Sequence, residues 1–282
     1  MQNTSFRFFL LFLHLLFILG CSGGGSGVAV RSEAVIGRGL VLEDSFENAE
    51  ISPRWGEPLI VDAEHYAPAT RESVFSNKVV RNGSFAGHYY TLAGSNEKTP
   101  WQVILREPQI SNIFGGLPEE MYVEWAEYFE DGYCFPTSSQ KMVRLGFDNP
   151  SIPESKKEYG VVTQTGNRNL NYQMFCGAWG NNSNCSVDFG THSERPIPTG
   201  RWVKLGFWVK LNTPGKSDGH ARLYLDDSLL ISNSDVDLRG RDTRGINYLW
   251  IGGNYSMLAA GGLRCSGHRY IDDIKIYRTI EK

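Results

Sequence analysis

The chain repeats short runs in which apolar and polar residues alternate, with Gly, Pro, Asn and Asp between the runs. Alternation with a period of two places successive side chains on opposite faces of a strand, and the separating residues favour turns. No long stretch has the spacing of an amphipathic helix. The clearest predicted strands cover residues 121–129, 141–147, 170–175, 202–211, 221–225, 248–252 and 270–277. Such a pattern predicts an all-β sandwich of two antiparallel sheets.

Composition narrows the class of protein further. The 282 residues are 12% aromatic and 21% charged, with a formal net charge of −3. Disordered chains have few aromatic residues and more charge, so we expect a folded chain. The near-neutral balance argues against nucleic acid as a partner, because phosphate binding needs a basic surface. We find no internal repeat and no second composition regime, and we expect one domain over residues 35–282.

The N-terminus has the features of an export signal. Arg7 precedes an apolar run over residues 8–19 that only His14 interrupts. The run is too short for a membrane-spanning helix and ends in small residues, which is typical of a signal peptide. The sequence Ile-Leu-Gly-Cys then ends at Cys21 and resembles a bacterial lipobox, in which the cysteine thiol takes the lipid.

These features predict how the protein is held in the cell. Residues 1–21 are expected to be a lipoprotein signal peptide, and the Gly- and Ser-rich residues 22–34 a flexible tether. A lipid on Cys21 would anchor the chain in the bacterial cell envelope, at the outer membrane or cell surface, as its only contact with the membrane. The alternative is an ordinary secretory signal with a chance cysteine.

Four cysteines remain once Cys21 is assigned to the lipid. An even number of cysteines in an exported chain suggests disulfides. Cys176 and Cys185 flank a turn-rich loop, so we expect them to pair, which leaves Cys134 to pair with Cys265. Free buried thiols are the alternative. No cysteine spacing matches a zinc site.

Several segments resemble a known family. They are Gly-Arg-Trp-Val-Lys at 200–204, Lys-Leu-Asn-Thr-Pro-Gly-Lys-Ser-Asp-Gly at 210–219, Leu-Tyr-Leu-Asp-Asp at 223–227, and the runs at 42–47, 121–129, 140–145 and 269–277. Together they resemble the concanavalin A-like, jelly-roll polysaccharide lyases of the alginate and glucuronan lyase type. The resemblance implies a jelly-roll β-sandwich and a polysaccharide partner. It departs at Lys141-Met-Val-Arg144, where the family often has Lys-Leu-Pro-Gly, so only the lysine matches.

A lyase of this kind needs three chemical groups. One neutralises the uronate carboxylate, one removes the adjacent proton, and one protonates the leaving oxygen. Tyr, Lys and His are the usual bases and acids, and Arg, Asn or Gln the usual neutralisers. The candidate catalytic residues are Lys141, Arg144, Tyr172 and Gln173, with His192 as a loop alternative. A solvated charge or a hydrogen-bonded sheet residue is the alternative for each of them.

Alternation also places aromatic and basic residues together on the faces that point away from the core. Aromatic rings pack on the C–H faces of pyranose rings, and basic neighbours hold anionic groups. The expected substrate-binding residues are Lys204, Trp208, Arg222, Tyr224 and Trp250, with Trp202 and Tyr248 as weaker candidates. We expect these positions to line an open groove. The alternative is that loops cover some of the rings.

Three carboxylates are candidates for a structural Ca²⁺ site, because first and last strands commonly pair in this fold. They are Asp44, Asp272 and Asp273, which would supply the oxygen ligands that Ca²⁺ prefers. Turn capping or pairing with Arg269 is the alternative. No other cofactor is expected.

The resemblance implies that the chain acts by β-elimination on an anionic, uronate-containing polysaccharide. A hydrolase is less favoured, because Glu124 and Glu127 fall on opposite faces of one strand and cannot act as a carboxylate pair. Two alternatives stay open on the same fold: a non-catalytic carbohydrate-binding lipoprotein, and a structural or adhesion protein.

Overall fold

The computed structural model describes residues 35–55, 74–91, 101–133, 135, 139–147, 157–166, 169–178, 192–255 and 267–281. All of them belong to one compact unit, Ser32–Lys282. The predicted signal peptide, lipidation site Cys21 and tether lie outside this part, as do Cys134, Cys185, Cys265 and the side chain of Cys176. The anchor and the disulfides therefore stay predictions. Within the same ranges, no helix is long and apolar enough to cross a membrane.

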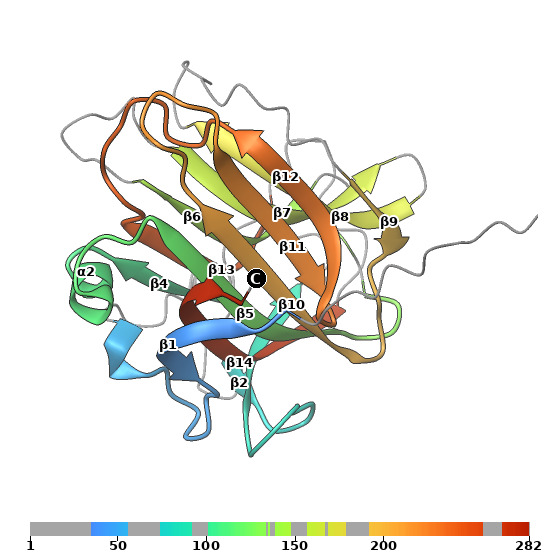
Figure 1. The fold of residues 1–282 in the computed structure, drawn as a ribbon. Helices are drawn as coiled ribbons and strands as arrows, with labels where there is room; N and C mark the ends of the chain where they lie inside the picture. The colour runs from blue at the N-terminus through green and yellow to red at the C-terminus, as the bar shows by residue number, and fades with distance from the viewer. Residues whose placement is uncertain are drawn as a thin grey trace, which may run out of the picture. The chain divides into compact units, whose positions relative to one another are not determined.

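Two antiparallel sheets build the domain (Figure 1). The larger has eight strands: β12 (Ser228–Val236), β11 (Gly219–Leu225), β10 (Trp202–Lys210), β5 (Glu120–Phe129), β14 (Gly267–Ile280), β3 (Ala86–Thr91) and β2 (Phe75–Ser76) in that order, with β1 (Gly37–Asp44) paired to β14. The smaller has six: β4 (Gln102–Arg106), β13 (Tyr248–Tyr255), β6 (Ser139–Phe147), β7 (Lys157–Gly166), β8 (Asn169–Ala178) and β9 (His192–Pro196). The predicted jelly-roll-type β-sandwich is confirmed.

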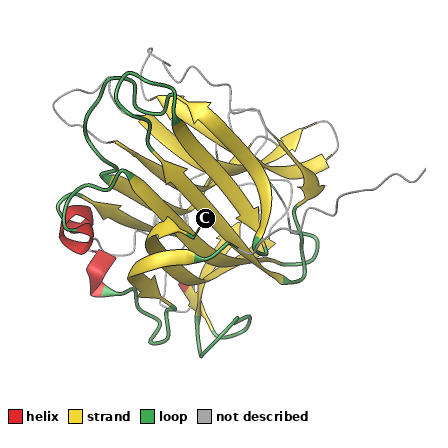
Figure 2. Cartoon of the chain, in the orientation of Figure 1, coloured by secondary structure: helices red, strands yellow, loops and turns green. Residues whose placement is uncertain are grey.

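Helix is a minor part of the described chain (Figure 2). It comprises the 3₁₀ turn η1 (Pro53–Trp55) and the short helix α2 (Gln109–Phe114), apart from a single helical residue at Val74. Each of the seven runs predicted as strands falls on a strand of the structure.

The core lies between the inner faces of the two sheets. On β10, Val203, Leu205, Phe207 and Val209 are buried there, as the alternation predicts. The facing sheet contributes residues such as Val143, Leu145, Leu249 and Ile251 to the same apolar cluster. Side chains that alternate with these point to the outer faces, and the outer faces of two sheets packed in this way lie on opposite sides of the sandwich.

A charged pair crosses the core between the sheets. Arg269 on β14 and Glu127 on β5 form an ion pair with no solvent exposure. Trp125 Nε1 donates a hydrogen bond to Glu127 Oε2 (2.9 Å), and Arg269 Nη1 donates to the carbonyl of Gly252 on β13 (3.1 Å). The pair therefore ties the eight-stranded sheet to the six-stranded sheet.

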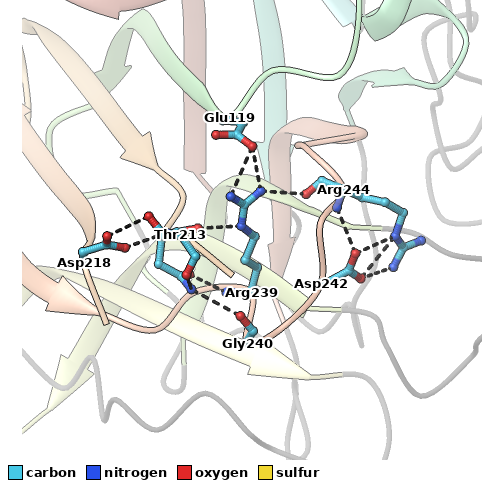
Figure 3. A network of polar contacts seen from close by, with 8 residues as sticks. Glu119, Thr213, Asp218, Arg239, Gly240, Asp242 and Arg244 are labelled. Atoms are coloured by element: carbon cyan, nitrogen blue, oxygen red, sulfur yellow. Dashed lines mark hydrogen bonds and ion pairs between the residues drawn. The ribbon is translucent and has the colours of Figure 1, made fainter. Parts of the chain in front are cut away.

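A second polar network joins the loops at one end of the sheets (Figure 3). Arg239 is buried, and its guanidinium donates to Glu119 Oε1 (3.1 and 3.2 Å) and to the carbonyls of Asn212 and Arg244 (2.6 and 3.3 Å). Asn212 Oδ1 accepts from the backbone N–H of Leu238 and of Arg239 (2.7 and 2.9 Å). One arginine thus holds the β10–β11 connection, the β12–β13 connection and the start of β5 together.

We expect Arg239→Ala to lower the free energy of unfolding by about 2–3 kcal/mol, because buried carbonyls lose charge-assisted hydrogen bonds. Urea denaturation would measure the change. Arg241→Ala is the matched control, since Arg241 is exposed two residues away and should shift stability by no more than about 0.5 kcal/mol. Equal effects of the two substitutions would contradict this role for Arg239.

Candidate functional site

The outer face of the six-stranded sheet gathers several of the predicted catalytic positions. Trp250 on β13 is the cross-strand partner of Arg144 on β6, which pairs in turn with Gly160 on β7 and through it with Phe175 on β8. Leu145 and Val143, which flank Arg144 in the chain, are in the core. Cross-strand partners share a face, so this row of residues points outward.

The neighbouring row brings in two more candidates. Lys141 pairs with Val162, which pairs with Gln173. The register shifts between Lys141 and Val143, and this bulge lets Lys141 and Arg144 share a face although they are three residues apart. Lys141 Nζ lies 5.9 Å from the ring centroid of Phe175, as residues on one face should. The structure therefore brings Lys141, Arg144 and Gln173 together.

Arg144 is held in a fixed position by aromatic rings. Its guanidinium carbon lies 4.2 Å from the centroid of the Trp250 ring and 5.9 Å from that of Tyr248. Only 7% of Arg144 is exposed, and the indole of Trp250 is fully buried, with Nε1 donating to Gln102 Oε1. The expectation that Trp250 is an open sugar-stacking platform is wrong. Trp250 instead supports the guanidinium by a cation–π contact.

Tyr172 does not belong to this face. Its neighbour Gln173 points outward, so Tyr172 points into the core, where it has no solvent exposure. Burial raises the pKa of Tyr172 well above its usual value. A phenol in this position cannot reach a polymer on the sheet surface. The prediction that Tyr172 is catalytic is therefore contradicted.

His192 lies nearer to the site than its sequence context suggests. It was expected in a loop, but it begins β9, and its backbone is the cross-strand partner of Gln173. Gly160 also belongs to this site, although the sequence pattern did not single it out. A Cβ there would lie 2.2 Å from the carbonyl oxygen of Val143, so only glycine lets β6 and β7 approach beside Arg144.

The other predicted substrate-binding residues lie on the opposite side of the sandwich. Lys204 and Trp208 belong to β10 and Arg222 and Tyr224 to β11, both in the eight-stranded sheet. They point to its outer face, because the residues between them fill the core. The prediction of a single groove is therefore wrong. Alternation correctly predicted that each side chain faces outward, but these residues lie on a different sheet from Trp250, Lys141 and Arg144.

These residues are also covered or already paired. Trp208 and Tyr224 are 1% and 6% exposed, in a cluster with Val35 and Ile280. Trp208 Nε1 donates to Glu120 Oε1 (2.8 Å), and the guanidinium of Arg222 lies 5.0 Å from the Trp208 ring centroid. Lys204 forms ion pairs with two carboxylates, Glu124 and Asp227. Open stacking on Trp208 and Tyr224 is contradicted by this burial.

The three predicted calcium ligands instead organise loops. Asp44 accepts hydrogen bonds from the backbone of Phe46 and Ser52 and from Trp55 Nε1 (3.1, 2.7 and 2.8 Å). Asp272 accepts from the backbone of Arg81 (3.1 Å), and Asp273 pairs with the Arg81 guanidinium (3.3 Å). Across the described ranges, no group of three or more His, Cys, Asp and Glu side chains is placed to hold a metal ion.

Asp272 should make stability depend on pH. Burial raises its pKa to about 7, so between about pH 4 and pH 7 the folded chain binds a proton that the unfolded chain releases. The contribution of Asp272 to stability is present at low pH and declines as the pH rises through this window. We expect Asp272→Asn to remove this part of the slope in urea denaturation at a series of pH values. An unchanged slope would contradict the assignment.

Comparison with known proteins identifies structures that share this fold. No protein-family model and no curated protein matches the sequence. Among solved structures, the chain is similar to the PL-14 alginate lyase from Aplysia kurodai (TM-score 0.62, 15% identity, covering 84% of this chain and 98% of that one). It is also similar to alginate lyase Aly36B (0.58, 10%, 88% and 98%) and to endo-β-1,4-glucuronan lyase from the fungus Trichoderma reesei (0.51, 11%, 72% and 85%).

Sequence identities of 10–15% support a shared fold, but they do not assign a role to any residue of this chain. The chain therefore shares the jelly-roll β-sandwich of the alginate and glucuronan lyases, and the outer face of its six-stranded sheet holds the cationic cluster that the sequence singled out.

Proposed function

We propose that the chain is a polysaccharide lyase that acts by β-elimination on an anionic, uronate-containing polymer. Its site is the outer face of the six-stranded sheet, around Arg144. Alginate and glucuronan, the polymers named for the similar structures, are both built from uronates, and Aly36B variants have been solved with alginate tri- and tetrasaccharides. The main support for the proposal is the pairing of strands β6, β7 and β8, in which Lys141, Arg144 and Gln173 share one face of the sheet.

The residues of this face suit the steps of the reaction. Arg144, buried against Trp250, offers a fixed guanidinium that pairs with the uronate carboxylate and stabilises the charge that develops when the adjacent proton leaves. Gln173 can donate an amide hydrogen bond to the same group. Lys141 is the candidate base for that proton. The electron pair then forms the carbon–carbon double bond as the glycosidic C–O bond breaks.

The leaving oxygen needs a proton donor as well. His192 is the candidate, because its backbone pairs with that of Gln173 on the adjacent strand. A histidine changes protonation state near neutral pH and can serve as a general acid.

The direct test is incubation of the mature domain with alginate and with polyglucuronate. A lyase produces an unsaturated sugar at each cleaved bond, so we expect ultraviolet absorbance to rise with at least one polymer. A hydrolase would release reducing ends without this absorbance. Binding in a gel-retardation assay with no absorbance would overturn the lyase and favour a non-catalytic carbohydrate-binding protein on the same fold. The low exposure of Arg144 is the observation that keeps this second candidate open.

We also propose that residues 1–34 export the chain and anchor it in the cell envelope through a lipid on Cys21. Expression in a bacterium that is labelled with radioactive palmitate should give a labelled, membrane-associated protein. The Cys21→Ala variant should lose both the label and the association. A label that persists in this variant would contradict the anchor.

A further inference from the structure

A row of aromatic side chains crosses the outer face of the eight-stranded sheet, on the side of the sandwich away from Arg144. His88 on β3 pairs with Tyr270 on β14, Tyr270 with Tyr128 on β5, and Tyr128 with Trp202 on β10. The four residues are direct cross-strand partners. With strands about 4.8 Å apart, the row spans roughly 14 Å.

The rings of the row touch one another. Ring centroids lie 4.9 Å apart between His88 and Tyr270, 5.9 Å between Tyr270 and Tyr128, and 5.7 Å between Tyr128 and Trp202. His268 extends the row: its Nδ1 lies 2.8 Å from Nε2 of His88, which is hydrogen-bonding distance, and the two ring planes differ by 15°. This contact fixes both imidazoles in one orientation.

Unlike Trp208 and Tyr224, most of this row reaches the surface. His88, Tyr128, Trp202 and His268 are partly exposed, and Tyr270 is the one buried member. Three polar atoms of the row form no hydrogen bond with the part of the chain that the structure describes: Trp202 Nε1, Tyr128 Oη and Tyr270 Oη. None of the three is among the fully buried polar atoms that lack a hydrogen-bond partner.

The charged side chains named beside the row already have partners. Arg201, beside Trp202, forms an ion pair with Asp226 (3.0 Å), and Lys204 is paired with Asp227 and Glu124. Glu130 lies at the other side, where its Oε1 accepts from the backbone N–H of His268 (2.7 Å). The row itself contains no lysine or arginine. It therefore offers apolar rings with N–H and O–H groups, and the two basic side chains named beside it in the described part of the chain, Arg201 and Lys204, are each held by a carboxylate.

We propose that this row, His88–Tyr270–Tyr128–Trp202 with His268, is a second glycan-binding surface, and that it takes a neutral polysaccharide. Pyranose rings present apolar C–H faces bordered by hydroxyl groups, which match partly exposed aromatic rings with free N–H and O–H groups. A protein partner would need a larger apolar patch than one row of rings provides. The surface is independent of the lyase site, and one polymer could be held there while another is cut on the opposite face.

Affinity gel electrophoresis of the mature domain tests the proposal. Gels would contain a neutral polymer (β-glucan, mannan, xylan or galactan) or alginate. We expect at least one neutral polymer to retard the protein. Trp202→Ala and Tyr128→Ala should each weaken that retardation about tenfold. Trp202→Phe should keep part of it, and Arg144→Ala on the other face should leave it unchanged.

Thermal melting would establish that the variants are folded, and size-exclusion chromatography would report self-association. The proposal is overturned if no neutral polymer retards the protein, or if Trp202→Ala and Tyr128→Ala, both folded, bind as the parent does. Loss of a dimer in Trp202→Ala would assign the row to contact with a second copy and would also overturn it. Failure of lyase activity leaves these readouts untouched, so the two proposals are separately tested.

Discussion

Arg144→Ala is expected to lower the rate of β-elimination by about 10²–10³-fold, the usual effect of removing one preorganised group that stabilises developing charge. The guanidinium is nearly buried on the outer face of the six-stranded sheet, 4.2 Å from the Trp250 centroid. Its removal takes away the group proposed to neutralise the uronate. The measurement is the initial rate of absorbance increase with alginate or polyglucuronate.

Arg222→Ala is the matched control for this variant. Arg222 also lies over an indole, 5.0 Å from the Trp208 centroid, but on the outer face of the eight-stranded sheet. Loss of its cation–π contact should affect stability to a similar degree and leave the rate unchanged. Arg144→Lys should recover only part of the rate, because an ammonium cannot form the bidentate pair with a carboxylate. Equal losses in Arg144→Ala and Arg222→Ala would exclude a direct role for Arg144.

Arg269→Met is expected to lower the free energy of unfolding by about 3–5 kcal/mol, which is a large part of the stability of a typical domain. The substitution leaves the carboxylate of Glu127 fully buried without its cation. Burial already raises the pKa of Glu127, and the charge of Arg269 opposes that rise. The variant also loses the hydrogen bond to Gly252 that ties the two sheets together. Urea denaturation would measure the effect.

The double variant Glu127→Leu with Arg269→Met tests whether the loss of stability comes from leaving one buried charge unpaired. Replacing both charges with apolar groups should restore much of the lost stability, since no buried charge is left unpaired. The exposed pair of Arg38 and Glu281 is the control: Arg38→Ala should cost less than about 1 kcal/mol. If the double variant unfolds more easily than Arg269→Met, the unpaired charge of Glu127 is not the cause of the lost stability. The ion pair itself would then stabilise the fold.

Local alternation predicted the class of fold and the face of most side chains along each strand. The assignment of Val203, Leu205 and Phe207 to the core is confirmed, because a period of two follows directly from strand geometry. Seven strands were not among the clearest predicted runs: β1, β2, β3, β4, β7, β9 and β12. In β7, Gly160 interrupts the pattern of apolar residues.

Alternation could not decide between neighbours such as Tyr172 and Gln173. Adjacent strand residues face opposite ways, so only one of the two could serve a surface site, and the tertiary structure placed Tyr172 in the core. Nor could it reveal the bulge between Lys141 and Val143, because a bulge depends on how the partner strand pairs. That bulge is what brings Lys141 onto the face of Arg144.

The sequence by itself determined a two-sheet sandwich with an apolar interior and with cationic and aromatic residues facing outward, since these properties depend only on neighbouring residues in the chain. Which strands share a sheet was decided by the tertiary structure alone. β13 pairs with β4 and β6, far from it in the chain, and this separates Trp250 from Trp208 and Tyr224. Backbone hydrogen bonds between distant strands set that arrangement, and the local pattern of side chains does not reveal which strands will pair.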